Sequence, residues 1–159
     1  IASQNKRNRR IFITNELFQE GKSLVSHCSK DDLFFAGLAF YASEGTKIDK
    51  GCCFSNSDPK IIRFMVEWFI TYWKIPMDKF HGSVWLHEGL SESEAIKYWS
   101  RITKIPSRQF YKTYIEKNKP DSKKIRKNIH KYGVFSFYIH DVYLLRKIMG
   151  GIDGILTAS

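Results

Sequence analysis

Apolar residues along this chain follow two different periods, and each period predicts a different kind of element. After Asp58 and Pro59 they recur three and four positions apart, at Ile61, Ile62, Met65, Phe69 and Tyr72. This spacing places them on one face of a helix, with Asp58 as its N-cap and Pro59 at its first position. We expect the helix to end before Pro76, because proline cannot continue it.

Two other segments alternate apolar with polar residues, which is the period of a half-buried strand. The first is His81–Glu88, where Val84 and Leu86 occupy alternate positions. The second is Tyr132–Ile139, whose apolar face would hold Phe135, Phe137 and Ile139. Upstream, residues 46–56 predict a hairpin that turns at residues 49–51, with Cys52, Phe54 and Asn56 on one face.

Capping signals mark the remaining helices. We expect a short helix over Ile11–Ser26, a helix over Asp32–Ser43 capped by Ser29, a helix to about Thr103 opened by a Ser91 and Glu94 capping box, and a helix over Asp141–Met149 stopped by Gly150 and Gly151. Together the elements predict an α+β fold with an antiparallel, twisted sheet backed by helices on one face. Residues 29–159 would form a single domain, preceded by a basic arm and short helix over residues 1–28.

Composition limits the classes of protein to consider. With 159 residues, 43% hydrophobic and 15% aromatic, the chain can bury one core. It has no apolar run of about 18 residues, so we expect no membrane span. Cys28, Cys52 and Cys53 form an odd set, which favours a reducing, intracellular compartment such as the cytoplasm, nucleoid or an organelle matrix. We expect no cleavable signal sequence, and because residue 1 is not Met, we expect residues to be missing from the start.

The net charge of +10 is concentrated in two segments. Residues 1–10 carry four cations and no acid, and residues 101–131 carry eleven cations against two acids, a net +9, which leaves −3 for the rest. Tyrosines and amides lie among these cations, so one segment offers phosphate attraction together with stacking and edge contacts. Nucleic acid is therefore the expected partner. A solvated basic face and an anionic membrane surface are the alternatives.

Small residues gather in the segment Asp32–Lys47, DLFFAGLAFYASEGTK. Ala36, Ala39 and Ser43 would share one flat helical face that another backbone could approach closely. We expect Gly45 to provide a left-handed exit from the helix, leaving Glu44 at the C-terminal end. Because a carboxylate there faces the unfavourable end of the helix dipole, a cation or basic partner is expected beside it. A buried core helix with an incidental acidic end is the alternative.

The segment Gly37–Gly45, GLAFYASEG, resembles the LAGLIDADG motif of homing endonucleases and of regulators with the same fold. Ala39 and Ser43 match its small positions and Glu44 its acidic position, while Ala42 replaces its first aspartate. The resemblance implies a LAGLIDADG-like sheet that saddles DNA, with two such helices packed across a two-fold axis. A chain with one motif would then be a homodimer, whose interface would hold Ala36, Gly37, Ala39, Phe40 and Ser43.

The activity that this resemblance implies is site-specific cleavage of double-stranded DNA by metal-assisted phosphodiester hydrolysis. Mg²⁺ or another divalent cation would be held at Glu44 and Gly45, and a lysine would neutralise developing charge, with Lys47, Lys112 and Lys131 as the candidates. Two alternatives are a DNA-binding regulator that does not cut and, less favoured, an RNA-binding helper of intron splicing. The expected nucleic-acid contacts are Lys47, Lys50, Ser55, Asn56, Trp85, His87, Arg108, Gln109, Lys112, Lys123, Lys124, Arg126, Lys127 and Lys131.

A second DNA-binding pattern overlaps the basic segment. The helix to about Thr103, the KIPS turn and a possible helix from Ser107 to Glu116 have the outline of a helix-turn-helix, in which Arg108, Gln109 and Lys112 would face the major groove. A two-helix packing unit with solvated basic residues is equally compatible with this pattern. Other site patterns fail: Ser91 stands where a zinc-binding HExxH motif needs its second histidine, and no CxxC pair occurs.

Overall fold

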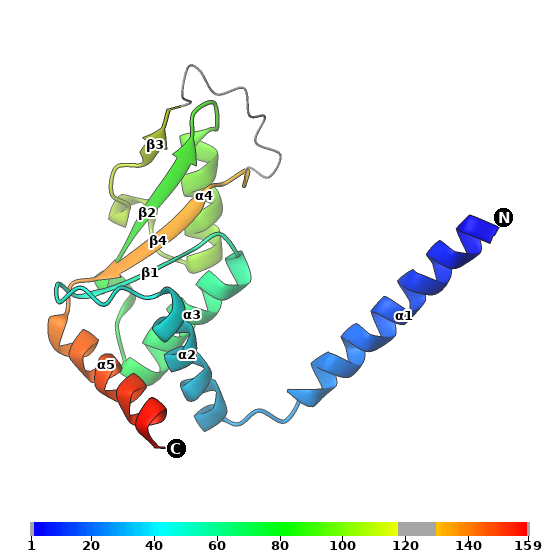
Figure 1. The fold of residues 1–159 in the computed structure, drawn as a ribbon. Helices are drawn as coiled ribbons and strands as arrows, with labels where there is room; N and C mark the ends of the chain where they lie inside the picture. Colours follow the sequence, from blue (N-terminus) through cyan, green and yellow to red (C-terminus); the bar gives the residue numbers. More distant parts are fainter. Residues whose placement is uncertain (1, 118–129, 159) are drawn as a thin grey trace. The chain divides into compact units, whose positions relative to one another are not determined.

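A computed structural model describes residues 2–117 and 130–158 of the chain (Figure 1). Two compact units are present, Ile1–Leu33 and Phe34–Ser159. The expected basic residues Lys123, Lys124, Arg126 and Lys127 lie outside the described residues. Within the described ranges, no helix is both long and apolar enough to cross a membrane.

The first unit consists mainly of one long helix, α1 (Ala2–Leu24). It includes the basic residues that we expected to precede a shorter helix, and it runs through Gly21 without interruption. The unit also holds the start of α2 (Lys30–Glu44), where the Ser29 hydroxyl accepts a hydrogen bond from the Asp32 N–H at 3.2 Å. The Asp32 carboxylate accepts bonds from the Ser29 N–H and hydroxyl, which lower its pKa. The predicted cap at Ser29 is therefore confirmed.

The second unit contains a four-stranded sheet with the order β1-β4-β2-β3. Its strands are β1 (Cys52–Asn56), β2 (Phe80–His87), β3 (Tyr114–Glu116) and β4 (Val134–Ile139). β4 pairs antiparallel with both β1 and β2, whereas β3 pairs parallel with β2. The α+β class is confirmed, but the expectation of a wholly antiparallel sheet is wrong. The helix between β2 and β3 returns the chain in its starting direction, which makes that pair parallel.

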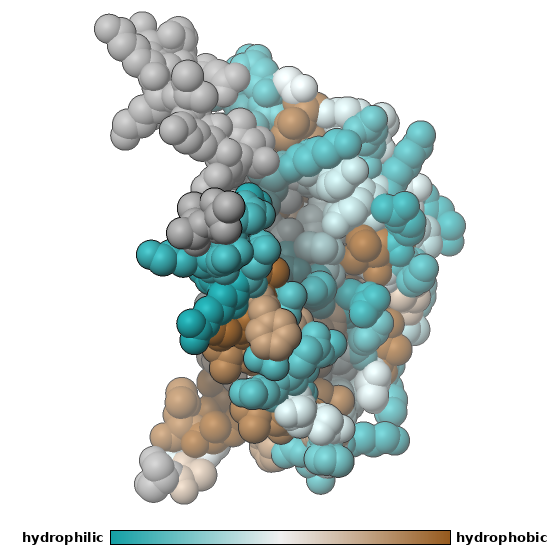
Figure 2. All heavy atoms as spheres, turned by 90° about the vertical axis from the view of Figure 1, so that its right-hand side faces the viewer, coloured by the Kyte–Doolittle hydropathy of each residue, from teal (hydrophilic) through white to brown (hydrophobic). Residues whose placement is uncertain are grey.

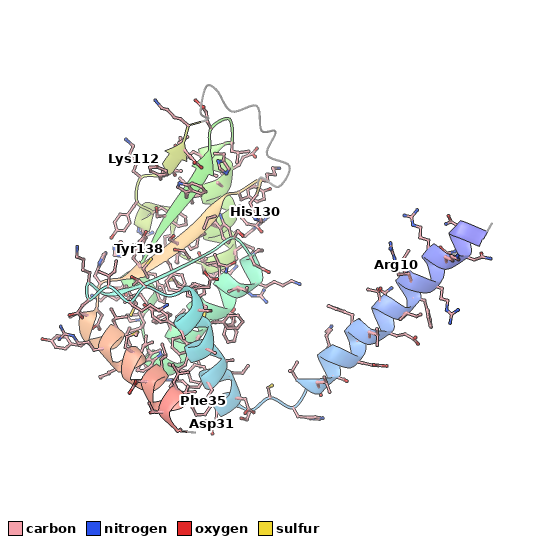
Figure 3. The ribbon with its side chains drawn as sticks, in the orientation of Figure 1. Arg10, Asp31, Phe35, Lys112, His130 and Tyr138 are labelled. Atoms are coloured by element: carbon pink, nitrogen blue, oxygen red, sulfur yellow. The ribbon has the colours of Figure 1, made fainter. Side chains whose placement is uncertain are left out.

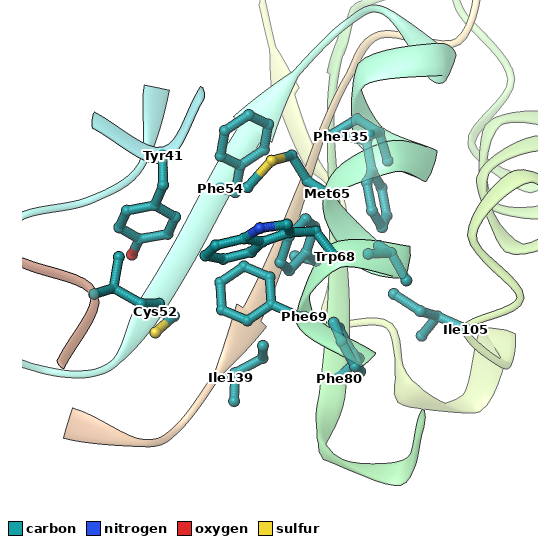
Figure 4. Packing of buried hydrophobic residues seen from close by; sticks show 14 of the residues in the cluster. Tyr41, Cys52, Phe54, Met65, Trp68, Phe69, Phe80, Ile105, Phe135 and Ile139 are labelled. Carbon is teal, nitrogen blue, oxygen red and sulfur yellow. The ribbon is translucent and has the colours of Figure 1, made fainter. Parts of the chain in front are cut away.

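Helices cover one face of this sheet, and the core lies between the two layers (Figures 1 and 4). α3 (Pro59–Trp73) and α4 (Glu92–Thr103) lie behind the strands, and α5 (Val142–Thr157) follows β4. Every second strand residue faces this core, as the alternation predicted. These residues include Cys52, Phe54, Phe80, Val84, Leu86, Phe135, Phe137 and Ile139, all at most 3% exposed.

Local signals placed the helix starts correctly. The Asp58 carboxylate accepts a bond from the Lys60 N–H at 2.8 Å, and α3 begins at Pro59 and ends before Pro76. The Ser91 hydroxyl caps α4 by accepting a bond from the Glu94 N–H at 3.3 Å. Each cap satisfies a backbone donor that the first helical turn leaves without an intrahelical partner.

Three further expectations differ from the structure. The helix expected over Ser107–Glu116 is only a 3-10 turn at Ser107–Gln109 followed by β3, so the helix-turn-helix prediction is wrong. α5 does not stop at Gly150 and Gly151, because Ile152 on the next turn remains buried in the core. The first arm of the hairpin contacts β1 only through an isolated bridge between Gly45 and Phe54 and a bond between the Thr46 N–H and the Cys53 carbonyl.

Candidate nucleic-acid interface

The sheet face opposite α3 and α4, which lie behind the strands in Figure 1, carries polar and aromatic residues. It carries the strand residues that alternate with the core positions, namely Cys53, Ser55, His81, Ser83, Trp85, His87, Val134, Ser136 and Tyr138, together with Tyr114 of β3. We call this set the open face. Most of these side chains are half-buried, and Trp85 and Tyr114 are 36% and 61% exposed.

Serines form a row across the middle of the open face. Ser55 and Ser83 lie on either side of Ser136 in the strand register, and the Ser55 and Ser136 hydroxyl oxygens are 2.6 Å apart. Serine side chains are short, so they project little above the sheet surface here. Each hydroxyl can donate and accept a hydrogen bond. The row can therefore lie close to a ligand that has its own polar edge.

A cluster of rings occupies the end of the open face where β2 begins. The His81 and Tyr111 rings are parallel within 6°, with centroids 5.2 Å apart. The Tyr111 hydroxyl is 2.6 Å from Nε2 of His140, whose ring lies 5.3 Å from that of His81. Beside them is a hollow of about 500 Å³ lined by Lys79, His81, His140 and Asp141, with apolar walls from Ile75, Pro76 and Ile139.

Burial changes the titration of two groups on the open face near this cluster. It raises the pKa of the Tyr138 phenol and of the Cys53 thiol, and neighbouring hydrogen bonds oppose the shift only in part. Both groups are therefore uncharged at neutral pH. An uncharged hydroxyl and thiol do not repel a polyanion, which keeps this part of the face compatible with phosphate.

Trp85 and Tyr114 form a flat aromatic surface toward the other end. Their rings are parallel within 8°, with centroids 6.3 Å apart, and neighbouring strands hold them side by side. Next to them, Nδ1 of His87 lies 3.1 Å from a carboxylate oxygen of Glu116. Exposed rings of this kind can stack with bases or contact their methyl groups.

The C-terminal end of α2 lies against β1, because Gly45 bridges to Phe54. Glu44 is exposed, and its carboxylate has no partner among the described residues. The Lys47 ammonium donates to the Gly45 carbonyl at 2.5 Å and to the Tyr41 carbonyl at 3.4 Å. This lysine supplies the cation that we expected at the negative end of the helix dipole.

Two expectations for Gly45 need correction. Its φ lies outside the left-handed region, so Gly45 is not a left-handed exit from the helix. The position requires glycine because a Cβ there would come within 2.6 Å of the Tyr41 ring and carbonyl. Its carbonyl, expected to bind metal, accepts the Lys47 bond. A positive ammonium at that oxygen disfavours a divalent cation in the same place.

One face of α2 is largely exposed. Ala39 and Ser43 are exposed, Ala36 is half-buried, and Phe40 is 37% exposed while packing on Phe64. Phe35, 52% exposed, lies toward the start of the same helix (Figure 3). Gly37 does not belong to this face, because a Cβ there would lie 2.0 Å from the Trp68 indole of the same chain. Its assignment to a dimer interface is therefore wrong.

The three candidate lysines do not gather at Glu44. Bridges run across the sheet from Gly45 through Phe54, Phe137 and Gly82 to Phe110, which is two residues before Lys112. Four strand spacings place Phe110 roughly 20 Å from Gly45. Lys131 instead lines a hollow on α4. Of the three candidates, only Lys47 is next to Glu44 within one chain.

Other expected nucleic-acid contacts have different environments. The Gln109 amide donates to the Met77 and Phe80 carbonyls at 3.0 and 2.6 Å, so it holds a turn and is not a groove contact. The Asn56 side chain accepts from the Asp58 N–H at 2.8 Å, just before α3. Lys50, Arg108 and Lys112 are exposed, and Lys112 projects from the edge of the sheet in Figure 3.

No pattern in the sequence predicts the ring cluster of His81, Tyr111 and His140. Tyr111 falls in the segment that the sequence predicts to be helical, and its position beside His81 depends on the bond from its N–H to the Gly82 carbonyl at 2.7 Å. That contact joins residues 29 positions apart, so no local pattern indicates it. His81 lies on the same face of β2 as Trp85 and His87, because even numbers of positions separate the three residues.

No protein-family model matches this chain, and neither a curated protein nor a solved structure matches it. Within residues 2–117 and 130–158, no group of three or more His, Cys, Asp or Glu side chains could hold a metal ion.

Proposed function

We propose that this protein is a homodimeric, LAGLIDADG-like DNA endonuclease that binds duplex DNA on the open face. The observation that carries the proposal is the position of Glu44. It is an exposed, unpartnered carboxylate among the described residues, at the end of a helix whose free face carries Ala39 and Ser43. Two such helices packed face to face would bring two Glu44 carboxylates together at the junction of two sheets.

The open face supports binding of DNA. Its centre is uncharged and polar, and Lys47, Lys50, Lys112 and Arg108 are exposed at or near its margins. Basic margins attract the phosphate backbone, while the Ser55, Ser83 and Ser136 row and the Trp85 ring offer contacts to base edges. The chain's net charge of +10 favours association with any nucleic acid.

Glu44 suits a divalent cation better than Gly45 does. Carboxylate oxygen is the ligand that Mg²⁺ prefers, and one Glu44 from each of two chains would hold the ion. The Gly45 carbonyl does not fit, because Lys47 donates to it. Bound Mg²⁺ would polarise a phosphate and lower the pKa of a bound water. Lys47 would contribute positive charge beside the scissile phosphate.

A second function, a DNA-binding regulator that does not cut, is favoured by the same lysine. The Lys47 ammonium already provides a cation at the end of α2, so the helix end is stable without metal. The two functions share the open face and the dimer, and they differ only in what Glu44 does.

A plasmid cleavage assay tests the proposal. Purified full chain would be incubated with a library of supercoiled plasmids carrying random inserts, with Mg²⁺ or with EDTA. We expect Mg²⁺-dependent linear product from a subset of sequences, and Glu44→Gln should abolish it while preserving duplex affinity, because an amide is a poor metal ligand. Asp153→Asn, an exposed carboxylate on α5, is the matched control and should cut normally.

The results of the cleavage and binding assays distinguish an endonuclease from a regulator, and both from a protein that is neither. Sequence-dependent duplex binding without cleavage, unchanged by Glu44→Gln, would establish the regulator. Full cleavage by the Glu44→Gln protein would refute catalysis at this site. Absence of duplex binding at low salt would refute both functions, and preferential binding of RNA in the same assay would favour a role in splicing.

A further inference from the structure

The hollow beside the ring cluster takes no part in the proposed cleavage. Its volume of about 500 Å³ falls within the usual range for pockets that bind small molecules. It lies where β2 begins and β4 ends (Figure 1), because Phe80, the first residue of β2, pairs with Ile139, the last residue of β4. This pairing brings the two strand ends together, so that one hollow is lined by Lys79, His81, Ile139, His140 and Asp141.

One polar atom at this place has no partner in the chain. Nδ1 of His81 is buried and makes no hydrogen bond within the described residues. A buried polar atom without a hydrogen bond lowers the stability of a protein, so it points to a partner from outside the chain. Because His81 lines the hollow, a ligand seated there is in reach of this histidine.

Neighbouring rings hold His81 in a fixed orientation. The Tyr111 ring stacks on the His81 ring, and the Tyr111 hydroxyl is within hydrogen-bond distance of Nε2 of His140. The His140 ring in turn lies beside the ring of His81. Three side chains from different segments therefore support one another, and the imidazole needs little rearrangement when a ligand binds.

Backbone hydrogen bonds also fix the walls of the hollow. The Gln109 amide holds the turn between α3 and β2, within which the Lys79 N–H donates to the Pro76 carbonyl at 3.1 Å. On the side of β4, the Asp141 N–H donates to the Ile139 carbonyl at 2.8 Å. The hollow is thus formed in advance, which lowers the entropic cost of binding a ligand.

The walls of the hollow favour a flat ring that carries N–H groups. Ile75, Pro76 and Ile139 provide apolar surface, which suits the faces of a ring better than a sugar or a bare phosphate. One carboxylate oxygen of Asp141 accepts a bond from the Leu144 N–H at 2.9 Å. The other oxygen accepts no bond in the described part of the chain, so it is available to an N–H group of a ligand.

Lys79 adds a positive charge to the same hollow. Its ammonium is exposed and has no ion-pair partner in residues 2–117 and 130–158. A lysine attracts phosphate, but the Asp141 carboxylate would repel a bare phosphate in this space. A nucleotide satisfies both residues, because its sugar separates the phosphate from the N–H groups of the base.

We propose that this hollow binds a nucleobase, with an N–H group of the base at Asp141, its edge at Nδ1 of His81 and the attached phosphate at Lys79. The base belongs either to a free mononucleotide or to a nucleic acid in which one base stands outside the double helix. Binding of a free mononucleotide is independent of the proposed function. Binding of an unpaired base rests on it, because the nucleic acid must then lie on the open face.

The test compares His81→Phe with His27→Phe in the full chain. Phenylalanine keeps a ring that can stack on Tyr111 but lacks Nδ1, whereas His27 is exposed and does not line the hollow. The thermal midpoint would be recorded with each of the four ribonucleoside monophosphates and with inorganic phosphate, at constant ionic strength. Affinity would be measured for a fully paired duplex and for the same duplex with one extra, unpaired adenine.

A second pair of variants covers the case in which His81→Phe does not fold. Lys79→Gln removes an exposed charge from the hollow, and Lys60→Gln removes an exposed charge from the start of α3. We expect Lys79→Gln to weaken binding of a monophosphate or of the unpaired base, and Lys60→Gln to leave both unchanged.

Each result supports or overturns the nucleobase site. A midpoint raised by a monophosphate but not by inorganic phosphate, in the His27→Phe chain and not in the His81→Phe chain, supports a free nucleotide. A preference of about tenfold for the duplex with the unpaired base, lost in the His81→Phe chain, supports a base of a nucleic acid.

The remaining results separate this site from the proposed function. Duplex binding without either effect would overturn the nucleobase site and leave the proposed function intact. Stabilisation by inorganic phosphate as strong as by the monophosphates would show an anion site and overturn it as well. Stabilisation by a monophosphate without any duplex binding would refute the proposed function and keep the nucleobase site.

Discussion

Tyr41 is the residue on which the junction of α2 and the sheet depends. Its side chain is fully buried, its ring contacts Phe54 and Phe69, and its hydroxyl donates to the Thr46 carbonyl at 3.2 Å. Burial raises the pKa of its phenol, and burial also raises the pKa of the neighbouring Cys52 thiol to about 12. Two ionisable groups are thus held neutral beneath the proposed Glu44 site.

This burial predicts a loss of stability at alkaline pH. The Cys52 pKa is higher in the folded chain than its ordinary value of 9.0, so the stabilisation is complete below pH 9 and declines as the pH rises toward 12. The free energy of unfolding should fall by up to about 1.4 kcal/mol per pH unit for this group. Cys52→Ala should give a shallower decline between pH 8 and 10, measured by urea unfolding under reducing conditions.

Cys28→Ala is the control for this measurement, because Cys28 is exposed and its removal also takes away one thiol. It should leave the decline unchanged. If the free energy of unfolding falls equally with pH in the Cys52→Ala protein and in the unaltered chain, the Cys52 thiol does not stay protonated in the folded state.

At the scale of single elements, α5 shows how burial outweighs local preference. Gly150 and Gly151 each disfavour a helix by about 1 kcal/mol relative to alanine, and they led us to end it there. Leu144, Leu145, Ile148 and Ile152 are buried on one face of the helix, which runs to Thr157. Packing of an amphipathic face supplies most of the stability of a helix, so the glycines lower its stability without ending it.

Replacing selected glycines of α5 should therefore stabilise the protein. A Cβ at Gly150 or Gly154 would meet nothing within 4 Å, so Gly150→Ala and Gly154→Ala should each raise the free energy of unfolding by about 0.5 to 1 kcal/mol. Gly37→Ala provides the contrast, since its Cβ would overlap the Trp68 indole and should cost about 1 to 3 kcal/mol. Thermal denaturation of the three variants measures both effects, and destabilisation by both α5 substitutions would contradict the argument.

How much of each element could be predicted depended on how local its determinants are. The sequence predicts the Asp58 and Ser91 caps and the alternation of β2 and β4, because these features depend on residues close together in the chain. β3 was missed because its parallel partner lies 29 positions away and only pairing makes residues 114–116 a strand. The sequence predicts a left-handed φ at Gly45, but this position requires glycine because a side chain would clash with Tyr41.

At the scale of the whole molecule, the exposed part of α2 is the surface on which the proposed dimer depends. Exposed Ala39 and Ser43, with Phe35 and Phe40 partly exposed nearby, form an apolar and small-residue face. Apolar side chains also gather at the lower end of Figure 2, and at the end of α5 Ile155 and Leu156 are 42% and 72% exposed. Burial of such surface between two copies would stabilise a dimer.

Ala39→Leu tests this assembly without altering the core. If two α2 helices pack closely, the larger side chain should weaken the dimer by about 1 to 3 kcal/mol through overpacking. Because Ala39 is exposed in the single chain, the thermal stability of the monomer should be unaffected. Analytical ultracentrifugation over a concentration series gives the dissociation constants, and Thr71→Leu on the exposed side of α3 is the control. A chain that remains monomeric at high concentration would refute the dimer.

The order of the strands also determines when this protein can fold during its synthesis. β4 lies between β1 and β2 in the sheet, although it is the last of the four strands in the chain. Phe54 and Gly82 each pair with Phe137, so neither β1 nor β2 has its central neighbour until residues 134–139 have left the ribosome. The sheet therefore cannot close before β4 has been synthesised and has emerged from the ribosome. Until then the apolar faces of β1 and β2 stay open to solvent and to chaperones.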